Sequence, residues 1–345
     1  MLITSLSSAY IKSLLLPVLC CGLLVACQPP ERPNIAETRA VTDSSKVNID
    51  LNERCAGLNQ EMQQVNHERT VLALQQINQD LKLCLPLIAT DEQLKLLDLS
   101  HYMYDSFLSI QRSPTEQIAF EQYVNTVNTH PTLQQENFAQ MNLRDQYLVK
   151  HQGQAYIEIV TLADGSTAYR RNPQYLARIF APYLPEAEQS FIHGLANQNT
   201  QTIFVGKKLS IEPSVIAERA LFWESYLNNY PKSRYKSDAQ YLYQAYSQLL
   251  FTGTSEQKVS DNYSGTHNIN PQSLAAIKYV SQQTNSHLAR QANQFLSFVQ
   301  RDTHSYALDL EQEHQAAVRE VESKLGLVKI SFKDHKNCFA DAVCL

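Results

Sequence analysis

The stretch ALFWESYLNNYPKSRYKSDAQYLYQAY, Ala220 to Tyr246, predicts two helices joined by a tight turn. Aromatic residues and leucines recur on both sides of Tyr230-Pro231 at a spacing that places them on one face of a helix. Proline has no amide hydrogen for the helix interior, so Pro231 ends the first helix. Small Ala239 lets the second helix approach the first closely. We therefore expect packed helical hairpins.

This stretch resembles one tetratricopeptide-type helix pair, of the kind found in helical lipoproteins of the outer-membrane β-barrel assembly machinery and in related envelope proteins. The matching residues are Phe222, Tyr226, Leu227, Tyr230, Pro231, Ser233, Ala239, Leu242 and Tyr246. The resemblance covers only a small part of the chain, and no second copy follows at a period of about 34 residues. It implies helical packing and a role in binding another protein.

The composition favours a mainly α fold. The 345 residues include only nine glycines and are rich in leucine, glutamine, alanine and glutamate, which favour long helices over many tight turns. We expect helical hairpins or an irregular helical bundle with a small β-hairpin or three-stranded element. The net charge of −5 comes without basic blocks, which argues against nucleic acid as the main partner.

Periodicity and turn signals predict where the elements lie. The expected helices cover residues 55–65, 71–84, 90–108, 114–127, 143–149, 175–183, 185–197, 213–230, 273–284, 287–300 and 306–325. Thr90 and Gln93 have the spacing of a capping box. Residues 156–162 and 166–170 alternate around Asp164-Gly165 and predict a β-hairpin. Residues 327–332 could add a strand, and residues 202–211 are ambiguous.

A second informative stretch, LLVACQPPERP from Leu23 to Pro33, lies where an apolar segment stops. Lys12 precedes an apolar run that is too short for a comfortable membrane-spanning helix, which needs about 20 residues. Leu24, Val25, Ala26 and Cys27 resemble the lipobox of bacterial lipoprotein leaders at every position. The alternative is an ordinary cleaved leader with a chance cysteine.

The resemblance to lipoproteins implies an anchored protein. Residues 1–26 would be a signal peptide, and Cys27 would carry acyl chains that hold the protein to membrane lipid. Residues 27–52 are polar and proline-containing, which predicts a flexible tether before a helical, periplasm-facing domain over 53–345. Gln28 replaces the aspartate that signals inner-membrane retention, so we expect the outer membrane. A sub-boundary is possible near residues 150–172.

Four further cysteines follow Cys27, and an even number in an exported chain suggests disulfides. If Asn66-His67 bends a helical hairpin, Cys55 and Cys84 meet at its open end, within the reach of a disulfide. Cys338 and Cys344 would then close a small terminal loop. The alternative is buried or free thiols, and we expect no metal site because the cysteine spacing does not suit zinc.

Two groups of side chains are candidates for binding a partner. The aromatic residues Trp223, Tyr235 and Tyr241 could stack on a sugar or grip a peptide, although the cores of helix pairs use the same residue types. Arg170 and Arg171 form a basic patch beside the expected hairpin. A solvated surface with one or two ion pairs is the alternative for the arginines.

Candidate catalytic residues are few, and we assign none, with no cofactor. Glu224-Ser225 invites comparison with lytic transglycosylases, in which a helical glutamate is the acid/base, but the glycine-rich stretch of that family is absent. Asp309, Glu313 and His314 lie near one another on a polar helix and are more simply explained as solvated than as metal ligands.

These observations favour a lipid-anchored envelope protein that holds or recruits another envelope protein without catalysis. The alternative is an enzyme of envelope or cell-wall metabolism, a hydrolase or lyase. Carriage of a ligand in an apolar pocket between helices is a third possibility.

Overall fold

The computed structural model describes residues 51–126, 131–162, 164–206, 208–300, 310–330 and 336–345, which belong to one compact unit. The lipobox, Cys27 and most of the expected tether lie outside these ranges. Within them, the helices lack the combination of length and apolar character that crossing a membrane requires.

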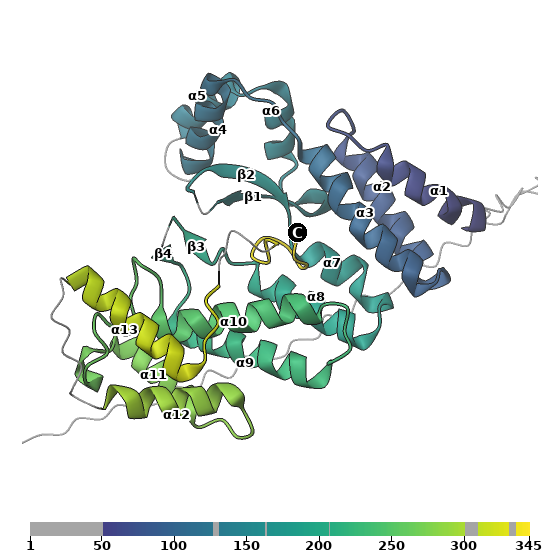
Figure 1. Ribbon diagram of the computed structural model, residues 1–345. Coiled ribbons are helices and arrows are strands. Elements are labelled where there is room, and N and C mark those ends of the chain that lie inside the picture. The colour runs from purple at the N-terminus through teal and green to yellow at the C-terminus, as the bar shows by residue number, and fades with distance from the viewer. Residues whose placement is uncertain (1–50, 127–130, 163, 207, 301–309, 331–335) are drawn as a thin grey trace, which may run out of the picture. The chain divides into compact units, whose positions relative to one another are not determined.

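The fold is mainly α, as the sequence predicts (Figure 1). The described ranges contain the helices α1 Leu51–Gln63, α2 Val71–Cys84, α3 Thr90–Leu108, α4 Pro114–Thr126, α5 Pro131–Gln140, α6 Leu143–Lys150, α7 Gln174–Ile179, α8 Glu186–Gln198, α9 Pro213–Asn229, α10 Lys236–Thr252, α11 Pro271–Ser281, α12 His287–Val299 and α13 Leu310–Leu325. Two antiparallel hairpins pair β1 Ile157–Thr161 with β2 Thr167–Arg171, and β3 Phe204–Val205 with β4 Lys208–Leu209.

Helices α1, α2 and α3 pack together through buried leucine, methionine and cysteine side chains. The chain reverses after α1, near Asn66, as the sequence predicts. Cys55 and Cys84 meet at the open end of this helical hairpin and form a disulfide with a Cα–Cα distance of 5.4 Å. The predicted pairing is confirmed, and its cause is local: each cysteine lies on the apolar side of its helix.

The predicted capping box at the start of α3 is wrong. Thr90 is already helical, and Ala89, which has no side-chain oxygen, occupies the N-cap position. The Gln93 side chain instead donates hydrogen bonds to the carbonyl oxygens of Leu85 at 2.8 Å and Ile88 at 3.3 Å. Because the helix begins one residue early, Gln93 stabilises the preceding turn.

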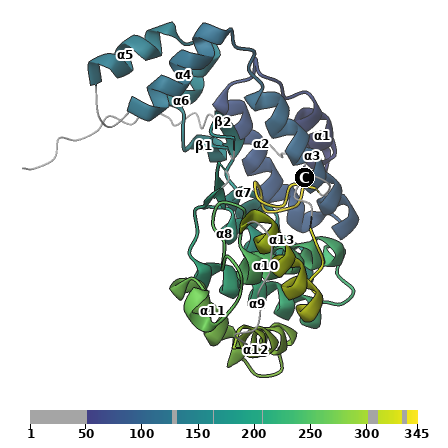
Figure 2. The ribbon, with the colours of Figure 1, turned by 60° about the vertical axis from the view of Figure 1, so that its left-hand side comes forward.

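Helices α4, α5 and α6 form a small group beside the β1–β2 hairpin (Figure 2). Phe120 is fully buried in a separate small apolar cluster there. Arg112 forms two hydrogen bonds of 2.8 Å to the buried carboxylate of Asp145 and lies over the ring of Phe120. The sequence did not predict α5, whose residues 131–140 lie in a stretch with a weak helical pattern.

The possible third strand is wrong for residues 327–330, which form neither helix nor strand. The Ile330 amide donates to Gln248 Oε1 on α10 at 3.1 Å, so a side chain takes the place of a neighbouring strand. Residues 331 and 332 lie outside the described ranges. The ambiguous residues 202–211 contain the short β3–β4 hairpin.

The C-terminal residues form a disulfide-closed loop. Cys338 and Cys344 are paired, as predicted, with a Cα–Cα distance of 4.0 Å. Asn337 and Leu345 exchange backbone hydrogen bonds of 2.8 and 3.0 Å across the neck of the loop. The buried side chain of Asn199, after α8, donates to the carbonyl oxygens of Cys338 and Asp341. We call residues 337–345 the C-terminal loop.

A buried ion pair attaches the C-terminal loop to the rest of the fold. Arg171, at the end of β2, contacts the Asp341 carboxylate at 2.6 Å, and the two side chains are 3% and 6% exposed. The same guanidinium donates to Ser100 Oγ on α3 at 2.7 Å and lies 5.0 Å from the centre of the Tyr175 ring. Helix α3, strand β2 and the C-terminal loop, which are distant in the sequence, therefore meet at the guanidinium of Arg171.

Helices α9 and α10 are the pair that the sequence predicts around Pro231. A second pair, α11 and α12, packs against α9 without carrying the sequence motif. Residues 253–270 separate the two pairs, so α9 and α11 do not follow each other at the roughly 34-residue period of a tetratricopeptide array. Residues 253–259 of this segment form part of the site described below.

We predict that Asp341→Asn lowers the free energy of unfolding by about 3–5 kcal/mol, because removing one charge of a buried pair leaves the other uncompensated. Denaturant titration followed by circular dichroism measures this. The matched control is Asp105→Asn, which removes an exposed carboxylate that lies 3.5 Å from His101 and should change stability by less than about 0.5 kcal/mol. Equal effects of the two substitutions would contradict the role given to the buried pair.

Candidate functional site

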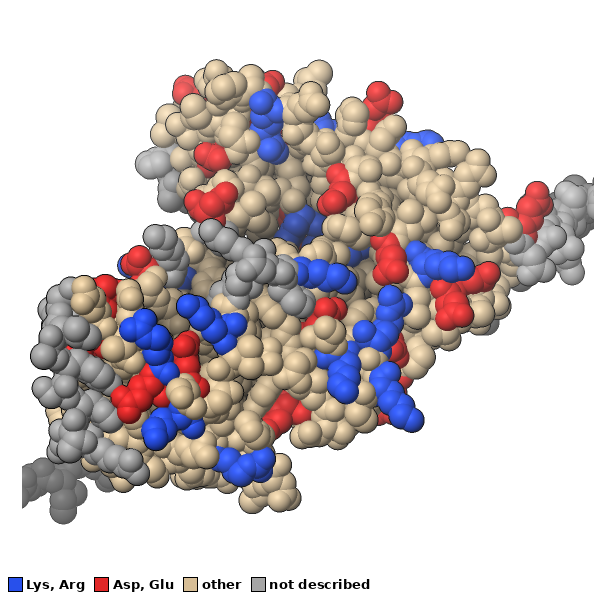
Figure 3. Space-filling view, viewed as in Figure 1, with Lys and Arg blue, Asp and Glu red and all other residues tan. Residues whose placement is uncertain are grey.

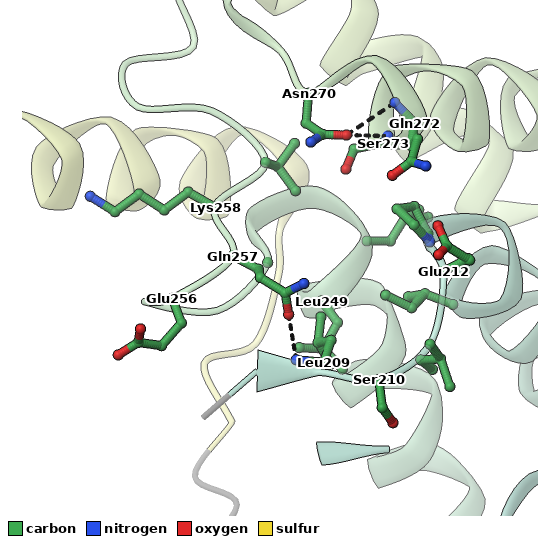
Figure 4. A pocket seen from close by; sticks show the side chains of 16 residues that line it. Leu209, Ser210, Glu212, Leu249, Glu256, Gln257, Lys258, Asn270, Gln272 and Ser273 are labelled. Atoms are coloured by element: carbon green, nitrogen blue, oxygen red, sulfur yellow. Dashed lines mark hydrogen bonds between the residues drawn. The ribbon is translucent and has the colours of Figure 1, made fainter. Parts of the chain in front are cut away.

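Two adjoining pockets, with volumes of about 390 and 380 Å³, lie where the starts of α9 and α11 meet. The first of them, drawn in Figure 4, also reaches the end of α10 and the segment that follows it. The two pockets share Glu212, Pro213 and Gln272. We call the two together the α9–α11 groove. Its lining residues that enter the argument below are Glu212, Ile216, Glu218, Leu249, Gly253, Gln257, Gln272, Ser273, Ala276 and Tyr279.

Two proline-marked helix starts build the groove. Pro213 and Pro271 each occupy the first turn of a helix, where the missing amide hydrogen costs nothing. Asn270 caps α11 by accepting hydrogen bonds from the amides of Gln272 at 3.0 Å and Ser273 at 3.1 Å. This cap places the side chains of Gln272 and Ser273 on the wall of the groove.

The segment after α10 forms the opposite wall. Gly253 has a φ of +73°, and a Cβ there would collide with the backbone oxygen of Gln257, so only glycine permits this close turn. The side chain of Gln257 in turn accepts a hydrogen bond from the Leu209 amide on β4 (Figure 4). The wall is therefore tied to the β3–β4 hairpin.

The groove is negatively charged. Glu212 and Glu218 are exposed, and neither carboxylate forms an ion pair or hydrogen bond with another described residue. The side chains of Glu256 and Lys258 point away from the centre of the groove (Figure 4). The Lys258 ammonium lies 3.4 Å from Glu311 and does not pair with Glu212 or Glu218.

Ser273 and Tyr279 also line the groove, and their side chains are available to a ligand. Ser273 is 7% exposed, and its hydroxyl has no hydrogen-bond partner within the described part of the chain. Tyr279 lies on the other side of Gln272, with 50% of its surface exposed. Below them, Ile216 and Leu249 provide a buried apolar floor.

This arrangement can bind more readily than it can catalyse. Carboxylates attract a cation, an exposed tyrosine ring attracts the same cation through its π face, and hydroxyl and amide groups pair with a peptide backbone. A serine nucleophile needs a base within hydrogen-bond distance. Among the described residues, Ser273 has no such partner.

The aromatic residues that we considered for partner binding lie in the core. Trp223 is fully buried and donates to Gln198 Oε1 at 2.9 Å, and Tyr235 stacks on the Phe191 ring at 4.3 Å. Tyr241 is also buried, and this burial raises its pKa to about 12. Core packing, the alternative at the sequence level, accounts for all three, so their proposed contact with a partner is corrected.

The expected basic patch at Arg170 and Arg171 is also corrected, because both side chains serve the C-terminal loop. Arg170 pairs with Glu158 at 2.6 Å and donates to the carbonyl oxygen of Ala340 at 3.1 Å, while Arg171 is buried against Asp341. On the face shown in Figure 3, basic and acidic side chains are interspersed.

Glu224 has a structural role. Its carboxylate accepts hydrogen bonds from Ser286 Oγ and the His287 amide at 2.5 Å, and from the Leu288 amide at 3.0 Å. These contacts cap the start of α12, where a helix dipole favours negative charge. Both oxygens are engaged, which disfavours the acid/base role considered for this residue.

The residues considered as metal ligands do not form a cluster among the described residues. His314 is buried, and its Nδ1 lies 3.1 Å from the carbonyl oxygen of Asp261. Asp309 lies outside the described ranges.

The groove residues themselves were missed at the sequence level. Glutamate, glutamine and serine are common at exposed helix positions, so no motif marks them. The available signal was indirect: Glu212-Pro213 and Asn270-Pro271 both indicate helix starts, but nothing local predicts that the two starts lie side by side. Comparisons with protein-family models, with characterised proteins and with solved structures found no match.

We predict that Glu224→Ala lowers the free energy of unfolding by about 1–3 kcal/mol, because the amides at the start of α12 lose a buried acceptor. The control is Glu136→Ala on the exposed face of α5, where the expected change is below about 0.5 kcal/mol. Thermal or denaturant unfolding measures both. A Glu224→Ala protein as stable as the control would show that the cap is dispensable.

Proposed function

We propose that this protein is a bacterial lipoprotein, anchored in the outer membrane through Cys27, whose helical body binds another envelope protein without catalysing a reaction. The observation that carries the proposal is the lipobox Leu24, Val25, Ala26 and Cys27. Several acyl chains on one cysteine hold a protein to a membrane far better than a single chain, because each buried methylene contributes about 0.8 kcal/mol.

The disulfides support an exported protein. Cys55–Cys84 and Cys338–Cys344 are both formed, and such bonds persist in oxidising compartments. A flexible tether over residues 27–52 would have a root-mean-square reach of about 25–30 Å. That length would let the helical body stand clear of the lipid surface and meet a partner.

The contacts within the body support binding over catalysis. Glu224, the residue that we compared with the acid/base of lytic transglycosylases, accepts hydrogen bonds from the amides at the start of α12. The α9–α11 groove instead offers hydrogen-bonding groups and carboxylates that no other described residue pairs with, beside an apolar floor. Such a mixture suits recognition of another protein, as the resemblance to a tetratricopeptide-type pair also implies.

We predict that Cys27→Ser abolishes lipid labelling and releases the protein from the outer-membrane fraction. Cells grown with radiolabelled palmitate are fractionated on a sucrose gradient, and the protein is followed by immunoblotting. Cys20→Ser is the matched control, since this cysteine lies seven positions earlier in the expected leader and should leave labelling unchanged. Retained label and unchanged fractionation of the Cys27→Ser protein would overturn the anchoring proposal.

A further inference from the structure

We infer that the α9–α11 groove binds an extended peptide segment that carries a lysine or arginine side chain. The inference deepens the proposed function and rests on it, because the segment would belong to the partner protein. It assigns one end of the groove to the cation and the other end to the peptide backbone.

The cation end is formed by Glu212, Glu218 and Tyr279. Both carboxylates are exposed and are not paired with any other described residue, and the tyrosine is 50% exposed beside them. An ammonium or guanidinium group there would gain charge-assisted hydrogen bonds from the glutamates and a cation–π contact with the ring. Small Ala276 on the same wall leaves room for the aliphatic stem.

The backbone end is formed by Gln272 and Ser273. The Ser273 hydroxyl lines the groove, belongs to a residue that is 7% exposed, and has no protein partner within the described ranges. The hydroxyl oxygen is not one of the fully buried atoms without a partner, so it faces the open space of the pocket and can exchange water for a group of a ligand. An extended peptide supplies both amide donors and carbonyl acceptors, which match a hydroxyl and a side-chain amide.

The size of the groove fits a short segment. Its two pockets of about 390 and 380 Å³ adjoin through Glu212, Pro213 and Gln272. Each lies in the range of about 300–1,000 Å³ that is usual for a bound small molecule. A few extended residues, which rise about 3.3 Å each, would place a basic side chain in one pocket and neighbouring backbone in the other.

The charge of the groove disfavours phosphate ligands. Nucleic acids and anionic lipid headgroups need clustered lysine and arginine residues, whereas Glu212 and Glu218 would repel them. Lys258 lines the first pocket, but its ammonium is directed away from the centre (Figure 4) and lies close to both Glu311, at 3.4 Å, and Asp261, at 3.9 Å.

The test uses the full-length protein, purified in detergent, to select binders from a phage-displayed library of random dodecapeptides. We expect the enriched peptides to contain lysine or arginine. The tightest peptide is then made with a fluorescent label and its affinity is measured by anisotropy. Replacing its basic residue with norleucine should weaken binding by at least about tenfold, because the ion pairs and the cation–π contact are lost together.

The protein variants locate the site. Glu212→Gln with Glu218→Gln should weaken binding by about tenfold, and Ser273→Ala should weaken it by about threefold, whereas Glu136→Gln on α5 should have no effect. Circular dichroism and the unfolding midpoint show that each variant is folded. Both glutamates of the groove are exposed, so their substitution should leave stability nearly unchanged.

Enrichment of peptides without a basic residue, or failure to enrich any peptide, would overturn the inference. So would equal affinity of the groove variants and the wild-type protein, which would place peptide binding on another surface and leave partner binding intact. The anchoring part of the proposed function is tested separately by Cys27→Ser, so the two failures are distinguishable.

Discussion

The buried ion pair between Arg171 and Asp341 is the contact on which the arrangement of the chain depends. Burial of two charges is expensive unless geometry and additional hydrogen bonds compensate, and here Ser100 Oγ and two tyrosine rings complete the surroundings of the guanidinium. The pair joins α3, β2 and the C-terminal loop, which are far apart in sequence. The side chain of Asn199, at the end of α8, donates hydrogen bonds to the same loop. The disulfide-closed C-terminal loop is therefore bound both by β2 and by the residue that follows α8.

Between α8 and α12, side-chain caps and a close turn fix several of the helix starts and loops. Glu224 fixes the start of α12 against α9, and Asn270 fixes the start of α11. Gly253 allows the segment between the two helix pairs to fold back toward Gln257. These constraints hold the α9–α11 groove open while leaving Glu212, Glu218 and the Ser273 hydroxyl without partners among the described residues.

Local signals in the sequence predicted much of the fold and little of the site. The hairpin that joins Cys55 to Cys84 and the turn at Asp164-Gly165 follow from spacing within a few tens of residues, so periodicity and turn chemistry were sufficient. Arg171 and Asp341 are separated by 170 positions, and no local pattern distinguishes a buried arginine from a surface one. Trp223 and Tyr235 were expected on a binding surface but are buried in the core. The sequence could not separate the two, because aromatic residues are common both on binding surfaces and in cores. The groove combines residues from 209–218, 249–259 and 270–279, and no local pattern predicts that these three stretches meet.

The central claim is that this groove holds a basic segment of another envelope protein, and photo-crosslinking in living cells tests it most directly. A photoreactive amino acid is placed at position 279 of the full-length protein, with position 136 on α5 as the matched control site. The account predicts that position 279 crosslinks to one defined envelope protein, and that mass spectrometry maps the crosslink within a few residues of a lysine or arginine. A crosslink of equal yield from position 136, or the absence of any crosslink from position 279, would contradict it.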